Sequence, residues 1–530
     1  MYSRQSNGIR FSISDLSPPR ARLLKCVYRE RAAISLFDAL NKPKDGQNAA
    51  PLTFPAETIT LVSQTLARFW SIAVNDYDVP PSQVTVFATE AMRRAENAAS
   101  MLGAIKSAAP DLVVHILAPA VETLFGSVGA RSAFVDVKGL FLDLGGGSVQ
   151  MTYIDTYAAR AGAQDHSGVG YEVAAALAGE SLPFGAARLI RILEDSNTDV
   201  QASEVSKLQV GMREAFRNLQ AKFPTLTATV ATTLEAEDDK STKKDSGIDI
   251  YLCGGGFRGY GSILMHSSKI QPYPVPAVGS FTVSGKAFGN TKDMVKINKI
   301  FDGKIFGMSK RRREQFPAIV TVVEALIAAV PRIRSVTFCA GGNREGALMM
   351  KLPREIRDGN PLACLGAAVP PIAGPAVEAH VILKTLLTAL PDDLNINNAA
   401  TVFGLQLGNI YAAQIWDRMG EDADANASAA LHDAVTRDPG CPGLTHLARA
   451  TLGITLCARW GSNLGPIDQD LYRGLRALVE RADPEGPFWA DYIGAVTAAL
   501  AMVVTRYPRS QQSTHGNIRY VQVFTFTPIC

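Results

Sequence analysis

Three consecutive glycines after a strand-like run constrain the fold of this chain more than any other feature. In the stretch FLDLGGGSVQ (residues 141–150), apolar residues lead into Asp143 and then into the turn Gly145, Gly146, Gly147 and Ser148. Because glycine has no Cβ atom, such a turn bends sharply and lets a ligand approach the backbone. Successive N–H groups can then bind an anion such as phosphate. A tight hairpin between two strands is the alternative for this stretch taken alone.

Three other stretches pair a strand with a turn. They are SNGIRFSI (residues 6–13), CGGGFRG (253–259, with Gly254, Gly255 and Gly256) and CAGGNREG (339–346). Four such turns in one chain indicate convergence on one nucleotide or polyphosphate in a cleft between two domains. Arg258 or Arg344 would supply a guanidinium fork for its phosphate oxygens. Asp143, where its strand ends, is placed to hold Mg²⁺ directly or through water.

Strand-like and helix-like runs alternate over the first two thirds of the chain, which predicts an α/β fold with layered sheets. Strands are expected at residues 8–14, 84–88, 113–117, 139–144, 151–154, 249–253 and 335–339, and helices at 90–107, 121–128 and 203–223. The apolar run 317–330 contains Glu324 and is too short to span a bilayer, so it predicts a buried helix.

The pattern of predicted secondary structure changes beyond residue 372. Helical runs at 376–390, 443–460 and 471–481 predict a third, all-helical domain. The polar segment 235–246 predicts a surface loop. The last stretch, 511–530, fits the helical domain poorly and receives no structural interpretation.

The composition narrows the partners and the compartment. A net charge of only +3 predicts neither nucleic-acid nor membrane binding. Seven cysteines are scattered without a CxxC pair, which argues against a zinc site or a disulfide framework and favours a reducing compartment. No signal peptide is recognisable. We therefore expect a cytoplasmic protein.

Together these stretches resemble the Ppx/GppA family of exopolyphosphatases and guanosine pentaphosphate phosphohydrolases. Further matching stretches are FATEAMRRAEN (87–97), VETLFGSVGA (121–130), SLPFGAARL (181–189) and GMSKRRREQFPAI (307–319). The resemblance covers residues 3–365 and implies two actin-like domains, of the ribonuclease H-like ATPase superfamily, flanking a cleft. It is strongest to the family's fungal retrograde-regulation branch, which is regarded as regulating mitochondria-to-nucleus signalling rather than as a proven hydrolase.

The resemblance also implies roles for individual residues. Glu122 falls on the family's catalytic glutamate, which polarises the attacking water, and Asp143 falls on the metal-linked acid. The first phosphate turn matches Ser6, Asn7 and Arg10, and the second matches the turn from Gly145 to Ser148. Gly254, Gly255, Gly256 and Arg344 complete the expected phosphate-binding set. Without the family match, Glu122 reads as a solvated helix residue.

Three departures from the family pattern concern the metal site. Ser3 stands where the family has Asp, Gln5 where it has Gly, and Gln150 where its hydrolytic members have Glu. An amide forms hydrogen bonds but cannot neutralise a cation. The loss of two acids should therefore weaken Mg²⁺-dependent hydrolysis more than anion binding, because phosphoryl transfer depends on charge stabilisation by the metal.

We predict a first actin-like domain over residues 1–135, whose N-terminal strand is truncated, and a second over 136–368. The helical domain is expected over 369–510 and a tail over 511–530. Three functions remain open at this point. The first is a regulator that binds nucleotide or polyphosphate, with a protein partner on the helical domain. The others are a Mg²⁺-dependent phosphohydrolase and an interaction scaffold with a vestigial site.

Two further patterns have ordinary interpretations. The basic run 310–313 resembles a nuclear-localisation signal, but Ser309 could cap a short helix whose basic residues face solvent. His446 and Arg449 lie three residues apart on a predicted helix. A buried polar pair or a partner surface is the interpretation for them, rather than catalysis.

Overall fold

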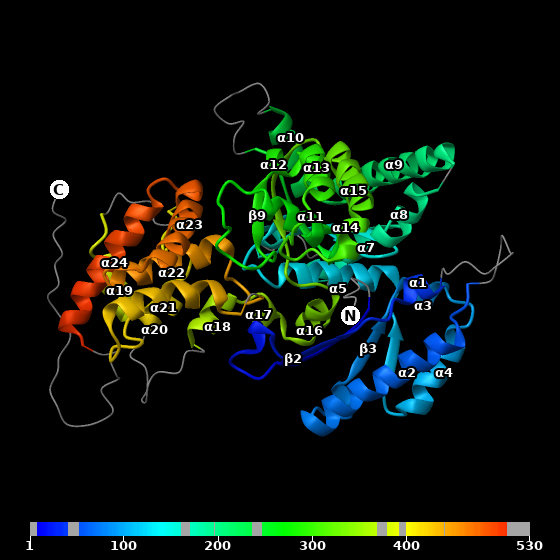
Figure 1. Cartoon of the computed structure of the whole chain (residues 1–530), viewed down its shortest axis with the longest axis horizontal. Helices are drawn as coiled ribbons and strands as arrows, with labels where there is room; N and C mark the ends of the chain where they lie inside the picture. Colours follow the sequence, from blue (N-terminus) through cyan, green and yellow to red (C-terminus); the bar gives the residue numbers. More distant parts are fainter. Residues whose placement is uncertain are drawn as a thin grey trace.

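The computed structural model describes residues 8–40, 52–160, 170–195, 197–235, 246–367, 379–391, 399–438 and 440–505. Ser6, Asn7, most of the expected surface loop and the tail 511–530 lie outside these residues. Figure 1 shows three bodies in space. A six-stranded sheet with its helices forms the centre, a smaller α/β body lies on one side of it, and a group of helices lies on the other.

The smaller body, the first lobe, is formed by residues before 118. Its elements are β1 (Ile9–Asp15), η1 (Ala21–Leu23), β2 (Lys25–Ala32), α1 (Leu36–Leu40), α2 (Ala56–Ser71), η2 (Ile72–Asp76), η3 (Pro81–Gln83), β3 (Thr85–Ala88), α3 (Glu90–Arg94), α4 (Ala98–Ala108) and β4 (Val113–Ile116). β1 pairs antiparallel with β2, and β3 pairs parallel with β4. Phe69, Met101 and Ile105 are central members of its apolar core.

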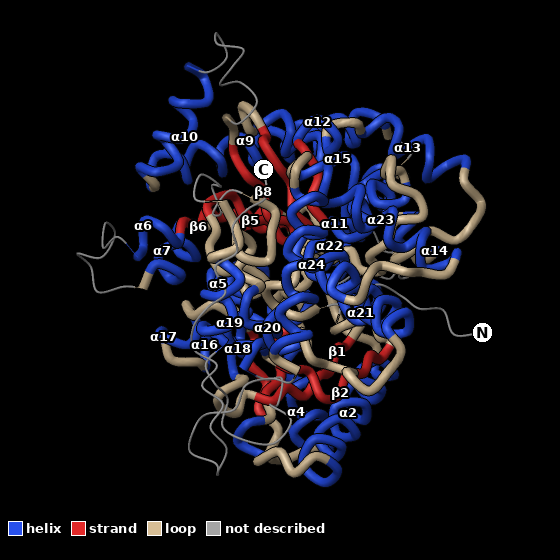
Figure 2. Tube along the Cα trace, turned by 90° about the vertical axis from the view of Figure 1, so that its left-hand side faces the viewer, coloured by secondary structure: helices blue, strands red, loops and turns tan. Residues whose placement is uncertain are grey.

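The second lobe is built on one sheet with the order β7-β6-β5-β8-β10-β9. Strands β5, β8 and β10 run parallel, so their carboxyl ends meet at one edge, while β6 and β9 are antiparallel to their neighbours. Helices α9, α11 and α15 lie on one face of this sheet and α5 and α7 on the other (Figure 1). Figure 2 shows the strands of this sheet as a group separate from those of the first lobe.

The bounds of the second lobe's elements follow. They are α5 (Pro119–Arg131), β5 (Lys138–Leu144), β6 (Val149–Asp155), α6 (Thr156–Arg160), α7 (Tyr171–Ala178), β7 (Glu180–Leu182), α8 (Ala186–Leu193), α9 (Thr198–Lys222), α10 (Pro224–Glu235), β8 (Ile248–Cys253), α11 (Gly254–His266), β9 (Phe281–Ser284), α12 (Gly285–Phe288), α13 (Thr291–Ile300), α14 (Lys310–Glu314), α15 (Phe316–Ala329), β10 (Ile333–Phe338), α16 (Asn343–Lys351) and α17 (Arg354–Arg357). α5 belongs here by packing, since it contacts α16, α7 and β5.

The helical domain consists of α18 (Pro361–Ala367), α19 (Ala379–Leu387), α20 (Gly408–Gln414), α21 (Ala423–Thr436), α22 (His446–Arg459), α23 (Pro466–Ala482) and α24 (Gly486–Val503). The buried helix α22 packs against α21, α23 and α24. By length and composition α24 could cross a membrane, but one face of it contributes Ile493 and Leu500 to the domain core. Sequence reasoning did not single out α24.

Most predicted strands and helices are present, with two differences. The helix expected over 90–107 is interrupted at Ala95, which is extended, so that α3 and α4 are separate helices. The glycines after β8 do not form a free loop, because Gly254, Gly255 and Gly256 are the first turn of α11. The expected buried helix is α15, whose Val322 and Leu326 are fully buried.

The basic run at 310–313 forms α14, and Ser309 caps it by accepting a hydrogen bond from the N–H of Arg312. The capped helix was predicted, but the solvated basic face was wrong for its arginines. Arg311 pairs with Asp38 at 2.6 Å, and Arg313 donates to the carbonyl of Asn298 at 2.8 Å and to that of Phe301. The packing of the first lobe and of the loop after α13 accounts for this inward orientation.

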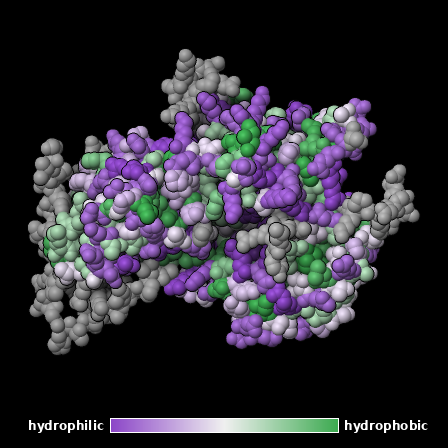
Figure 3. Space-filling view, in the orientation of Figure 1, coloured by the Kyte–Doolittle hydropathy of each residue, from purple (hydrophilic) through white to green (hydrophobic). Residues whose placement is uncertain are grey.

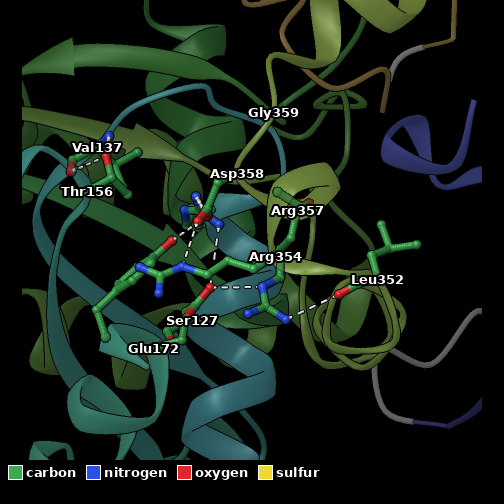
Figure 4. A network of polar contacts seen from close by, with 12 residues as sticks. Ser127, Val137, Thr156, Glu172, Leu352, Arg354, Arg357, Asp358 and Gly359 are labelled. Carbon is green, nitrogen blue, oxygen red and sulfur yellow. Dashed lines mark hydrogen bonds and ion pairs between the residues drawn. The ribbon is translucent and has the colours of Figure 1, made fainter. Parts of the chain in front are cut away.

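A buried ionic network joins α5 and α7 to α17 and Asp358, just before the helical domain begins (Figure 4). Arg131 of α5, which is 1% exposed, donates to Asp358 at 2.6 Å, and Arg357 donates to Glu172 of α7 at 3.0 Å. Burial raises the pKa of Asp358, but Arg131 and the hydroxyl of Tyr171 bring that pKa below its ordinary value. A displacement of α17 would leave buried charges unpaired, which is costly.

A second contact between the helical domain and the second lobe centres on His446. Its Nδ1 lies 2.8 Å from the hydroxyl of Tyr273, and its Nε2 lies 3.1 Å from the carbonyl of Gly279. A neutral imidazole satisfies both partners, because Nε2 donates and Nδ1 accepts. Arg449 lies buried nearby and donates to the carbonyls of Leu444 and Ala434. The expected buried polar pair is confirmed.

His446 predicts a loss of stability in acid. Burial lowers its pKa to about 3, whereas the unfolded chain takes up the proton near pH 6.5. The stabilisation is therefore complete above about pH 6.5 and falls toward pH 3, by about 2 kcal/mol at about pH 5. Urea unfolding at neutral and at acid pH should show this loss, and His446→Gln should reduce the pH dependence. His115, which is exposed on β4, gives the control His115→Gln, which should leave the slope unchanged.

Candidate functional site

A cavity of about 410 Å³ lies between the two lobes. The described residues of all four glycine-containing stretches line it, together with α3, α5, α14 and α15. The predicted site residues among them are Arg10, Glu122, Asp143, Gly145, Gly146, Gly147, Ser148, Gly254, Gly255, Gly256 and Arg344. Ser6 and Asn7 lie outside the described residues. The convergence that the sequence predicted is therefore present in space, and the roles of these residues remain predictions.

The turn at 145–148 is anchored from behind by α8. The N–H of Ala186 donates to the carbonyl of Gly145 at 3.0 Å, and the N–H of Ala187 donates to that of Gly146 at 2.9 Å. In the described part of the chain, no hydrogen bond uses the N–H of Gly146 or Gly147 as donor. The carbonyls are thus occupied on the α8 side, while two N–H groups at the cavity wall can receive an anion.

Two helices begin at the same cavity. The first turn of α11 contains the three glycines after β8, and α16 begins at Asn343 after Gly342. The first N–H groups of a helix have no partner within the helix and carry a partial positive charge. α11 and α16 therefore add N–H donors to those of the glycine turn.

Gly254 shows why glycine is required at the start of α11. Its φ is +88°, and a Cβ atom there would lie 2.3 Å from Oδ1 of Asp143 and 2.5 Å from the carbonyl of Leu144. Gly255 is different, since the nearest atom to a Cβ would be Nη2 of Arg312 at 4.0 Å.

This contrast gives a matched pair of variants. Gly254→Ala should destabilise the protein by about 1–3 kcal/mol, because it combines an unfavourable φ with a clash against Asp143. Gly255→Ala should be neutral or stabilise α11 by up to about 1 kcal/mol. Thermal unfolding of both variants measures the difference. Equal unfolding temperatures for the two variants would contradict the backbone argument.

Four arginines line the cavity from both lobes. They are Arg10 on β1, Arg258 on α11, Arg312 on α14 and Arg344 on α16. Burial lowers the pKa of Arg10 to about 10 and that of Arg312 to about 10, and repulsion by Arg258 adds to both shifts. Burial also lowers the pKa of Arg344. Arg10 is open to solvent through the cavity but is surrounded by protein, so its guanidinium group is poorly hydrated. Such a cluster favours a multivalent anion.

The two predicted acids of the site differ in their partners. Glu122 accepts a hydrogen bond from Arg93 at 2.9 Å, and burial nevertheless raises its pKa above the ordinary value. Burial likewise raises the pKa of Asp143, an effect that Arg258 and Arg10 oppose. Both acids line the cavity, where an attacking water and a metal ion would be expected in the family's hydrolases.

Gln150 is buried and has a structural role. Its Nε2 lies 2.7 Å from the hydroxyl of Ser148 and 3.3 Å from that of Ser181. A glutamate at this position could not donate these hydrogen bonds. The amide therefore fits the surroundings of the turn.

Sequence reasoning gave no site role to several residues that line the cavity, among them Arg312, Glu90 and Asn343. Arg312 was assigned to a solvated face. Oδ1 of Asn343 and Oε2 of Glu90 are buried and have no hydrogen-bond partner among the described residues. A signal for Glu90 was present, because it lies two residues after the end of β3, and Asp143 likewise lies close to the end of β5.

The two lobes are also joined across the cavity by ion pairs. Asp38 of α1 lies 2.6 Å from Arg311 of α14 and 3.3 Å from Arg191 of α8. Phe37 and Arg312, which neighbour two of these residues in sequence, line the cavity. The pairs hold the first lobe against the second at the cavity.

Mg²⁺ fits this site only together with a phosphorylated ligand. Among the described residues, no group of three or more His, Cys, Asp or Glu side chains is placed to bind a metal. Mg²⁺ is, however, often held by one or two carboxylates and by phosphate oxygens. The unpartnered Oε2 of Glu90, with Asp143 and Glu122 on the same cavity, is consistent with that mode.

Two successive segments of the chain each match a known protein family. Residues 16–355 match the Ppx/GppA phosphatase family, and residues 363–522 match the RTG2 C-terminal domain. Retrograde regulation protein 2 of Saccharomyces cerevisiae is 31% identical over 514 residues, which cover 94% of this chain and 79% of that protein.

Solved structures are similar over about two thirds of the chain. The Aquifex aeolicus PPX-GPPA enzyme is 17% identical and covers 65% of this chain and 95% of its own, with a TM-score of 0.44. An exopolyphosphatase from Cytophaga hutchinsonii is 16% identical and covers 66% of this chain and 95% of its own, with a TM-score of 0.42.

Proposed function

Because this chain belongs to the Ppx/GppA phosphatase family, with the actin-like fold of that family and a helical C-terminal region, we propose that it is a regulator that binds a nucleotide or polyphosphate between its lobes. The relative in Saccharomyces is named for retrograde regulation, and we propose the same kind of signalling role here. The four arginines around the cavity are the observation that carries the proposal.

The charge of the cavity supports an anionic ligand. The pKa values of Arg10 and Arg312 are lowered by burial and by neighbouring arginines, so these groups would gain from an anion placed between them. The glycine turn and two helix N-termini add N–H donors. A triphosphate or a polyphosphate carries enough charge to satisfy several arginines at once.

A path from the cavity to the helical domain supports a regulatory role. α16 contributes Arg344 to the cavity and leads directly into α17, whose Arg357 binds Glu172 in the buried network. We propose that closure of the lobes on a ligand shifts α16 and α17, and that a protein partner on the helical domain reads this shift. The six cysteines among the described residues are free, and we place the protein in the cytoplasm.

Binding is tested by calorimetry on the full chain with inorganic triphosphate, ATP, guanosine tetraphosphate and long-chain polyphosphate. At least one should bind, and Arg258→Gln should weaken it about tenfold or more, because a charge-assisted hydrogen bond contributes about 1.5–3 kcal/mol. Arg473 on α23 is exposed and far from the cavity lining, so Arg473→Gln is the control. Failure of all four ligands to bind folded protein would overturn the proposal.

A Mg²⁺-dependent phosphohydrolase is the second candidate, favoured by Glu122. Its carboxylate lines the phosphate cavity, and its raised pKa makes it a better acceptor for a proton of the attacking water. Bound Mg²⁺ would neutralise charge on the transferred phosphoryl group. Arg93 orients the Glu122 carboxylate through their 2.9 Å hydrogen bond.

Hydrolysis is tested by phosphate release from polyphosphate with Mg²⁺. If the chain is a hydrolase, Glu122→Gln should lower the rate about 100-fold or more, because the variant loses general-base assistance. Binding of the ligand, measured in parallel, should persist in this variant. A wild-type rate equal to that of buffer would exclude this second candidate and leave the binding proposal intact.

A further inference from the structure

Glu90 holds a position that the binding proposal does not explain. It is the first residue of α3 in the first lobe, and its carboxylate reaches the glycine turn of the second lobe. A Cβ atom on Gly147 would lie 1.7 Å from Oε2 of Glu90, so the carboxylate occupies the space directly beside that glycine. The Glu90 carboxylate thus lies against the glycine turn whose N–H groups are available to a phosphate.

The other contacts of Glu90 leave this oxygen without a partner. Oε1 lies 3.5 Å from Nη1 of Arg94, whose side chain is 33% exposed. Oε2 is buried and forms no hydrogen bond with any described residue. A buried carboxylate oxygen without a partner is unfavourable, since burial removes its water without replacing the hydrogen bonds. The partly exposed ion pair with Arg94 contributes little stability, so it does not by itself explain why the Glu90 carboxylate lies here.

A phosphate bound at Gly147 would make the position of the Glu90 carboxylate still less favourable unless a cation were present. Two anions in contact repel, and the surrounding protein screens that repulsion less than water does. Mg²⁺ removes the conflict, because it is commonly bound by one or two carboxylates and by oxygens of a phosphate ligand. The position of Glu90 beside the turn suits this arrangement.

Two positions at which the family resemblance implies acids carry uncharged side chains in this chain. Ser3 and Gln150 stand where the family has carboxylates. The Nε2 of Gln150 donates to Ser148 and Ser181, and the amide carries no charge with which to neutralise a cation. Asp143 and Glu90 both act electrostatically on Glu122, which places the three carboxylates around one space.

We propose that Glu90 is a ligand of a divalent cation that bridges the first lobe to a phosphate held at the glycine turn. The inference rests on the binding function proposed above. It assigns to Glu90 the charge that the missing acids no longer supply. Because no set of three acidic or metal-binding side chains is assembled among the described residues, the cation needs the phosphate to complete its coordination. Metal and ligand therefore bind cooperatively, and the bridge favours closed lobes.

The test uses inorganic triphosphate and the full chain, with EDTA or with excess Mg²⁺. In wild type, the metal should tighten triphosphate binding about tenfold or more, equivalent to about 1.4 kcal/mol. In Glu90→Gln, binding in EDTA should be unchanged or tighter, and most of the Mg²⁺ enhancement should be lost. Glu96, exposed in the segment that follows α3, gives the matched control Glu96→Gln, which should retain the enhancement.

Two further measurements distinguish a cation bound between Glu90 and the phosphate from simple repulsion between these two groups. Mn²⁺ paramagnetic resonance should show bound metal in the ternary complex of wild type and not in that of Glu90→Gln. Glu90→Asp keeps the charge but withdraws the carboxylate from Gly147, so it should also lose the enhancement. If thermal unfolding shows that Glu90→Gln does not fold, Glu90→Asp replaces it as the test variant.

The outcomes are distinct. If Glu90→Gln binds triphosphate more tightly by the same factor with and without Mg²⁺, Glu90 only repels the ligand and the inference fails. If wild type binds triphosphate equally with EDTA and with Mg²⁺, the inference fails while the proposed binding function stands. If triphosphate does not bind under either condition while another of the four ligands does, the bridge at a triphosphate is wrong.

Discussion

The contact between α5 and α16 is the constraint on which the site depends, because it brings these helices together backbone against backbone. A Cβ on Gly129 would lie 1.9 Å from the carbonyl of Gly342, and one on Gly346 would lie 1.8 Å from that of Phe125. Only glycines permit this approach. Since α5 carries Glu122 and α16 carries Arg344, the contact sets the position of the acid relative to the arginine.

The same contact links the cavity to the rest of the molecule. α16 passes into α17 and its buried ionic network, and the helical domain follows directly. Figure 3 shows the surrounding surface as largely hydrophilic, with apolar side chains in small separate groups. The hydrogen bonds of His446 to Tyr273 and Gly279, together with the apolar contacts of Tyr273 and Val275, join the helical domain to the second lobe.

The sequence predicted the features that depend on local pattern. The strand-to-glycine turns, the buried helix α15 and the cap at Ser309 follow from neighbouring residues, and they are where they were expected. The inward arginines of α14, the pairs of Asp38 and the orphaned oxygen of Glu90 depend on how two lobes pack. No local pattern encodes that packing, so Arg312 was assigned to solvent and Glu90 was overlooked.

The four guanidinium groups of the cavity have a consequence beyond recognition. Arg258 lowers the proton affinity of Arg10, Arg312 and Arg344, so its removal would relieve these three groups. Placing four positive charges together lowers the stability of the folded protein. Natural proteins seldom lie at their stability optimum. An anion bound among these arginines would relieve this repulsion, so the folded protein would gain stability on binding.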